Sequence, residues 1–140
     1  MLRIILGVVA GFIAWSIIWL GSDQVLITSS PLWYGNHQYG LQAAMTNQTS
    51  FTPDSTILLL HLVRGAVISI MAGFLAAFIA RENRRAPLIL GVLLLLFGIA
   101  VQAVAWRYLP LWYHLIFLGM LLPFTVLGGR LKRSGESPAR

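Results

Sequence analysis

The sequence predicts an all-α integral membrane protein, an antiparallel bundle of four transmembrane helices with both termini in the cytoplasm. Four apolar segments predict this fold: residues 3–27, 54–80, 87–107 and 111–129. A helix needs roughly 17–25 residues to cross a hydrocarbon core of about 30 Å, so each segment is long enough. The composition agrees, because 58% of the residues are hydrophobic and only 10% are charged. Soluble domains carry roughly 25% charged residues.

The basic residues predict the orientation in the membrane. Most of them flank the ends of the apolar segments that share one side: Arg3, Arg81, Arg84, Arg85, Arg130, Lys132, Arg133 and Arg140. The opposite side carries Arg107 alone, because Arg64 lies within the second segment. Short loops rich in Lys and Arg remain in the cytoplasm. We therefore interpret the net charge of +6 as a topology signal, and we expect no nucleic-acid partner.

The first apolar segment, residues 3–27, is expected to be a membrane helix. It is longer than the core of a cleaved signal peptide, which has about 7–15 apolar residues, and no Ala-x-Ala site follows it. Residues 28–53 then form an extracytoplasmic loop without Lys, Arg, Asp or Glu. Its tryptophan and tyrosine residues favour the membrane interface. Within this loop we expect a single short helical turn, at residues 41–45.

The remaining connections are short. Residues 81–86 and 108–110 are too few for anything but tight turns, and such turns join antiparallel neighbours. Residues 1–130 are therefore expected to form a single transmembrane domain. Residues 131–140 are polar and are expected to form a cytoplasmic tail.

Small residues predict where the helices pack. Helices in lipid gain most from close backbone approach, which small residues spaced four apart permit. The candidate packing positions are Gly65, Ser69, Gly73 and Ala77 in the second segment, and Gly7 and Gly11 in the first. These rows either face one another inside one bundle or face a second subunit.

Polar side chains within the apolar segments are the candidate functional residues. They are Asp23, His61, Arg64, Gln102 and His114, and all fall in the expected outer half of the bilayer. An arginine at the bilayer centre costs about 2.5–3.5 kcal/mol, so Arg64 needs a partner. Asp23 is the only carboxylate at a similar depth on another helix. We therefore expect Arg64 to point into the bundle and to pair with Asp23.

Three interpretations of this polar cluster stay open. The first is a structural hydrogen-bond network that fixes the register of the helices. The second is a cavity that binds an anionic or polar small molecule or a lipid head group. The third is a haem site with His61 and His114 as axial ligands and Arg64 near a propionate. We prefer the structural network and expect no cofactor.

Catalytic and metal-binding signatures are missing from the sequence. The chain has no cysteine, which excludes thiolate chemistry and cysteine-ligated metals. It also has no Ser-x-x-Lys, His-Glu-x-x-His or glycine-rich phosphate loop. We therefore expect neither an enzyme nor a metal site.

The C-terminal third carries a resemblance to a known type of protein. Residues 108–117, YLPLWYHLIF, and residues 127–131, LGGRL, resemble the last helix of small uncharacterised bacterial four-helix membrane proteins. Residues 11–15, GFIAW, and the segment that contains Arg64 are similar in style. The resemblance implies a four-helix architecture and a location in the bacterial inner membrane. It implies no reaction.

Two classes of function follow from these observations. The first is a non-catalytic accessory, scaffold or assembly subunit, favoured by the small size, the glycine rows and the charge-free loop. The alternative is a protein that binds or transports a small molecule or lipid head group through the cluster around Arg64. Transport would require oligomerisation, since no inverted repeat is visible. The expected partners are the lipid bilayer, other membrane subunits and a second copy of the chain.

Overall fold

Helices dominate the computed structural model, which describes residues 1–132. They account for 86% of this part of the chain, which contains no strand. Four helices are long and apolar enough to cross a membrane: α1 (Leu2–Ser29), α3 (Ser55–Ala80), α4 (Arg85–Ala105) and α5 (Leu111–Leu131). The prediction of an all-α fold is confirmed, and these helices indicate a multi-pass membrane protein. Most of the expected tail, residues 131–140, lies outside the described residues.

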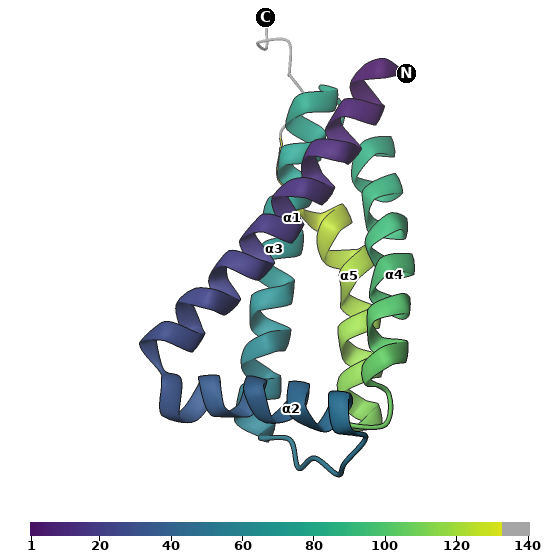
Figure 1. Ribbon diagram of the computed structural model, residues 1–140. Helices are drawn as coiled ribbons and strands as arrows, with labels where there is room; N and C mark the ends of the chain where they lie inside the picture. Colours follow the sequence, from purple (N-terminus) through teal and green to yellow (C-terminus); the bar gives the residue numbers. More distant parts are fainter. Residues whose placement is uncertain (133–140) are drawn as a thin grey trace, which may run out of the picture.

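The membrane-length helices are arranged around α3. This helix packs along α1 and along α5, while α4 packs mainly against α5. Figure 1 shows α1 beside the other helices near the N-terminus and then diverging from α4 and α5 along its length. A further helix, α2 (Asn36–Asn47), lies across the bottom of this view, from the end of α1 to the foot of α5. The helices are therefore closest at one end and separated at the other, which we call the α2 end.

The connection between α1 and α3 is more regular than the sequence predicts. In place of one helical turn at residues 41–45, it contains a π-helical turn, η1 (Pro31–Gly35), followed by the 12-residue helix α2. The prediction of a single turn is therefore wrong. Because α2 has polar residues on every face, its sequence lacks the hydrophobic period that would predict a helix. The segment is held instead by a tertiary contact, because the Tyr34 side chain is completely buried.

Two acidic side chains cap the membrane helices. The first N–H groups of a helix have no partner within it, so a nearby side chain must accept from them. Asp54 Oδ1 accepts from the Thr56 N–H at 2.9 Å, and α3 begins at Ser55. The Glu82 carboxylate accepts from the backbone N–H groups of residues 84, 85 and 86 at 3.2, 2.8 and 2.5 Å. Partial burial tends to raise the pKa of Glu82, but these donors leave it below its ordinary value.

Small residues of α3 lie at its contacts with both neighbours. Ser69 accepts a hydrogen bond from the indole Nε1 of Trp15 in α1 at 3.1 Å. A Cβ on Gly65 would lie 2.6 Å from a methionine side chain of α5, and one on Gly73 would overlap the backbone carbonyl of Thr125. The backbones of α3 and α5 therefore cross too closely at Gly73 for any side chain to fit between them.

The same kind of contact joins α1 to α3. A Cβ on Gly7 would lie 3.1 Å from the Ala80 Cβ, and one on Gly11 would lie 3.1 Å from the Ala72 carbonyl oxygen. Ala77 is also completely buried. All six candidate packing residues are buried against the chain's own helices. A second subunit would therefore have to bind to another surface.

Candidate functional site

Arg64 of α3 is enclosed by groups from α1 and η1 at the α2 end. Its Nη1 donates to the Tyr34 hydroxyl at 2.6 Å and to Asp23 Oδ1 at 3.4 Å. Its Nη2 donates to the backbone carbonyl of Trp19 at 3.1 Å, and the guanidinium lies 4.3 Å from the centre of the Trp19 ring. The ion pair expected between Arg64 and Asp23 is present. The positive charge of Arg64 is thus bound by the protein itself.

Tyr34 is a member of this group that the sequence analysis did not select. Its hydroxyl donates to Asp23 Oδ1, accepts from Arg64 and lies 3.2 Å from the Nε2 of His61. Burial, followed by the hydrogen bond to Asp23, raises the pKa of Tyr34 to about 12. The phenol therefore keeps its proton at physiological pH. Tyr34 ties η1 to both α1 and α3, and it holds α2 in place across them.

Gln38 of α2 completes the group and was also missed. Its Nε2 lies 2.8 Å from His61 Nε2 and 3.5 Å from Asp23 Oδ1. Gln38 thus bridges Asp23 to the Nε2 of His61, whose other ring nitrogen is Nδ1. That Nδ1 is buried and has no hydrogen-bond partner within residues 1–132. Side chains from α1, α2, η1 and α3 thus share one continuous network.

Gln102 and His114 form a separate pair. The Nδ1 of His114 lies 2.5 Å from Gln102 Oε1, and the His114 ring stacks on Trp106 with the ring centres 4.5 Å apart. No hydrogen bond among residues 1–132 links this pair to Arg64. The hydrogen bonds therefore divide the residues of the expected cluster into two groups, each with one glutamine bonded to one histidine. Each histidine uses one ring nitrogen in these bonds, and His61 Nδ1 and His114 Nε2 have no hydrogen-bond partner within residues 1–132.

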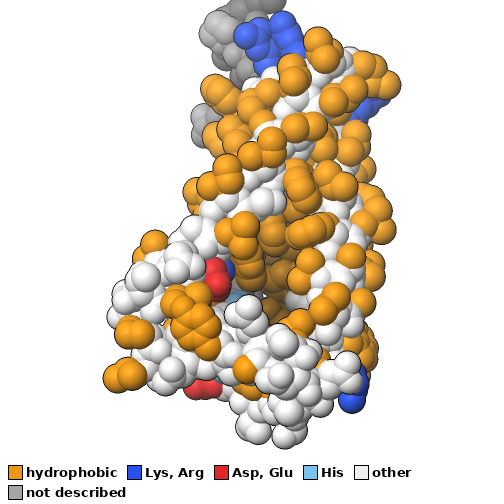
Figure 2. Space-filling model, viewed as in Figure 1, with side chains coloured by type: hydrophobic (Ala, Val, Ile, Leu, Met, Phe, Trp, Pro, Cys, Tyr) orange, Lys and Arg blue, Asp and Glu red, His pale blue; other side chains and the backbone are white. Residues whose placement is uncertain are grey.

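A cavity of about 600 Å³ lies between α1, α4 and α5, with α2 at its end. Its walls are mainly apolar and rich in aromatic rings, including Trp15, Trp19, Phe97 and Phe117. Figure 2 shows the hollow between α1 and α4, rimmed by apolar side chains, with acidic and histidine side chains at the α2 end. The cavity is therefore apolar along most of its length and polar at one end.

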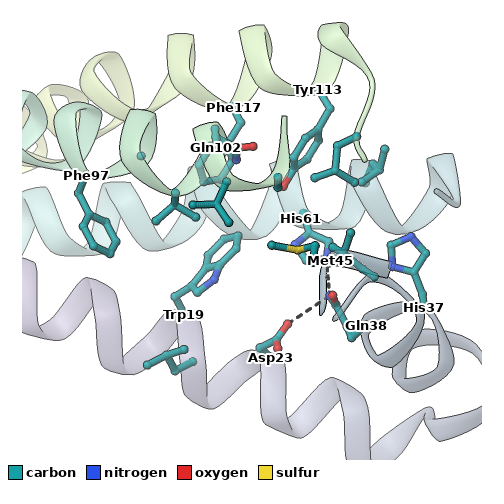
Figure 3. Close-up of a pocket in the computed structure, with 18 of the residues that line it drawn as sticks. Trp19, Asp23, His37, Gln38, Met45, His61, Phe97, Gln102, Tyr113 and Phe117 are labelled. Atoms are coloured by element: carbon teal, nitrogen blue, oxygen red, sulfur yellow. Dashed lines mark hydrogen bonds between the residues drawn. The ribbon is translucent and has the colours of Figure 1, made fainter. Parts of the chain in front are cut away.

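Five polar side chains define that end of the cavity (Figure 3): Asp23, Gln38, His61, Gln102 and Tyr113. Asp23 is the only carboxylate among them. The cavity is also lined by a further histidine of α2, His37, whose pKa is lowered by burial. Arg64 is not among the lining residues, and its guanidinium contacts Asp23, Tyr34 and Trp19. The expected anion site formed by Arg64 is therefore not what the cavity presents.

Neither a known relative nor a metal cluster defines this site. No family model matches the chain, and no curated protein or solved structure is significantly similar to it. The likeness to bacterial four-helix membrane proteins thus stays a prediction. Residues 1–132 contain no group of three or more His, Asp or Glu side chains placed to hold a metal ion.

Proposed function

We propose that this protein binds an amphipathic, lipid-like molecule, which enters the cavity sideways from the bilayer between α1 and α4. The observation that carries the proposal is a cavity of about 600 Å³ with apolar aromatic walls and a polar end. Ligand sites commonly have volumes of about 300–1,000 Å³ and combine apolar walls with a few polar groups. The apolar part of the ligand would lie along Trp15 and Phe97, and its head group would lie at the α2 end.

The proposed orientation places α2 on the outer face of a bacterial inner membrane, with both termini in the cytoplasm. Arg81, Arg84 and Arg130 support this arrangement, because they lie at or beside the helix ends that point away from α2 (Figure 1). The segment between α1 and α3 contains no Lys, Arg, Asp or Glu before Asp54. The positive-inside rule then assigns that segment to the outside. The cavity would open to lipids of the outer leaflet.

The accessory or scaffold role receives less support. It was favoured by rows of small residues that could face a partner, yet Gly65, Gly73 and Gly11 are occupied by contacts within the chain. Homo-oligomers and complexes with other membrane subunits would need a different surface. The binding role requires no catalytic residues and no cofactor.

The proposal is tested by a substitution that places a large side chain in the cavity. Ala105 lines the cavity, whereas Ala103 lies on an exposed face of the same helix and does not. Ala105→Trp should remove most of the lipid that copurifies with the protein after extensive detergent washing, measured by extraction and mass spectrometry. Ala103→Trp adds the same side chain outside the cavity and should retain wild-type levels. Equal lipid content in both variants would contradict the proposal.

A further inference from the structure

Gln102 and Tyr113 place hydrogen-bond donors on one wall of the polar end. Gln102 accepts from His114 through its Oε1. Its amide nitrogen carries two N–H groups, of which one faces the Tyr113 hydroxyl and the other is available. The Tyr113 hydroxyl donates to no group within residues 1–132, although the residue is only 4% exposed and lines the cavity. Both groups come from the α4–α5 side (Figure 3). A ligand oxygen at this wall would be able to accept from either.

Hydrogen-bond acceptors without a protein partner lie on the opposite wall. The contacts of Asp23 with Tyr34, Gln38 and Arg64 all use Oδ1. Its Oδ2 accepts from no described group, and neither does the Oε1 of Gln38. A ligand hydroxyl at this wall would be able to donate to either oxygen.

Both walls are close to His61. His61 lies between them, with its Nε2 2.8 Å from the Gln38 Nε2 and its ring centre 6.4 Å from that of Tyr113. A hydroxyl group both donates and accepts hydrogen bonds. It therefore matches an arrangement of acceptors on one side and donors on the other.

The charge of the lining selects against a phosphate. No Lys or Arg lines the cavity within residues 1–132. Arg64 already neutralises Asp23 at 3.4 Å and has an exposed fraction of only 11%. A buried phosphate would have no cation to pair with, and burying an unpaired charge is costly. The site as a whole suits a head group without net charge.

From this arrangement, and resting on the proposed function, we infer that the cavity takes a lipid with an uncharged, hydroxyl-bearing head group. A diacylglycerol and an isoprenoid alcohol share this chemistry. The hydroxyl donates to Asp23 or Gln38 and accepts from Tyr113 or Gln102. The hydrocarbon lies along the aromatic walls and extends through the opening between α1 and α4.

Tryptophan quenching tests the head group directly. Trp15 and Trp19 line the cavity, so replacing Trp33, Trp106 and Trp112 by Phe leaves emission only from these two. The detergent-purified variant is titrated with a dibromostearoyl diacylglycerol and, separately, with phosphatidylglycerol carrying the same chains. The diacylglycerol should reach half-maximal quenching at a concentration at least about threefold lower. Competition by unlabelled dioleoylglycerol and geranylgeraniol then identifies which type of lipid alcohol binds more tightly.

A matched pair of variants locates the hydroxyl. Tyr113→Phe removes one donor, and the loss of one hydrogen bond should raise the half-quenching concentration of diacylglycerol about two- to tenfold. Tyr108→Phe makes the same change outside the cavity lining and should have no effect. The comparison of head groups does not depend on the folding of Tyr113→Phe, because it is made with protein whose polar-end residues are unchanged.

The outcomes separate this inference from the proposed function. Equal or stronger quenching by phosphatidylglycerol would show an occupied cavity and overturn the head-group inference alone. The absence of quenching by either brominated lipid would overturn the proposed function as well. Displacement of the bound diacylglycerol by either unlabelled alcohol would support the inference, and displacement by neither would contradict it.

Discussion

The two ends of the helix assembly are built from different side chains. At the end that we call the packed end, residues 7–11 of α1 lie directly against residues 72–80 of α3, with glycine and alanine at the contacts. At the α2 end, aromatic, histidine and glutamine side chains surround a cavity of about 600 Å³. Helices in lipid associate mainly through close packing. The difference indicates that small-residue contacts hold the helices together, so that the α2 end can remain open for a ligand.

The largest loss of stability is expected where α3 crosses α5. Gly73→Leu would push a side chain into the Thr125 backbone, which cannot move aside as a flexible side chain can. We expect a cost of about 3 kcal/mol or more, at the upper end of overpacking effects. Thermal unfolding in detergent measures it. Gly119→Leu is the control, since a Cβ there meets nothing within 4 Å. Equal melting temperatures for the two variants would show that the crossing is not close.

The next largest effect is expected at the ion pair of the α2 end. Arg64→Leu should cost about 2 kcal/mol, below the roughly 3–5 kcal/mol of a fully buried pair, because 27% of the Asp23 side chain is exposed. The double variant with Asp23→Leu should lose less than the sum of the single losses. Unfolding of all three variants gives the coupling energy. Strictly additive losses would mean that the pair contributes nothing.

Tyr34→Phe should have an intermediate effect. The substitution removes a hydroxyl that links Arg64, Asp23 and His61, at an expected cost of about 1 kcal/mol. The α2 segment should also become more accessible, which limited proteolysis between residues 36 and 54 would detect. An unchanged cleavage rate would show that η1 and α2 are held by other contacts.

The same tyrosine predicts a dependence of stability on alkaline pH. Burial and the bond to Asp23 raise the pKa of Tyr34 from 10.0 to about 12. A pKa raised by folding stabilises the protein fully below the unfolded value, and this contribution is lost as the pH rises through the folded value. The wild type should therefore lose stability between about pH 10 and 12 more steeply than Tyr34→Phe does. Parallel pH curves for the two proteins would contradict the assignment.

The smallest effect on stability is expected for Tyr113→Phe. Tyr113 is as buried as a core residue, at 4% exposure, yet its hydroxyl donates to no other group of the described chain and has Gln102 as its hydrogen-bonding neighbour. Its removal should change the free energy of unfolding by less than about 0.5 kcal/mol. Comparing it with Tyr34→Phe in the same unfolding assay distinguishes a hydroxyl that stabilises the fold from one that is available to a ligand. A loss as large as that of Tyr34→Phe would assign Tyr113 to the structural network.

The sequence predicts the parts of this molecule that depend on the membrane itself. The four long helices follow from apolar length, and the contact between Arg64 and Asp23 follows from the cost of an unpaired charge at that depth. The close approach at Gly73 follows from residue size. Each of these features follows from a single property of the residues involved: apolar length, charge or size.

The cavity could not be predicted in the same way. Tyr34 and Gln38 lie in a segment without a hydrophobic period, and only the fold brings them to Arg64 and His61. The pairing of Gln102 with His114 depends on how α4 and α5 are rotated, which spacing along one helix does not determine. The full set of groups around Arg64 could not be predicted for a related reason. The groups that bind its charge come from η1 and from the backbone of α1.

The difference in packing between the two ends can be measured by replacing one alanine at each end with tryptophan. Ala76 is completely buried against α1, and Ala105 lines the cavity. The melting temperatures of Ala76→Trp and Ala105→Trp in the same detergent test whether one end is packed and the other open. We predict that Ala105→Trp folds and melts within a few degrees of the wild type, whereas Ala76→Trp yields little folded protein. Equal damage from both substitutions would contradict the existence of an open cavity at the α2 end.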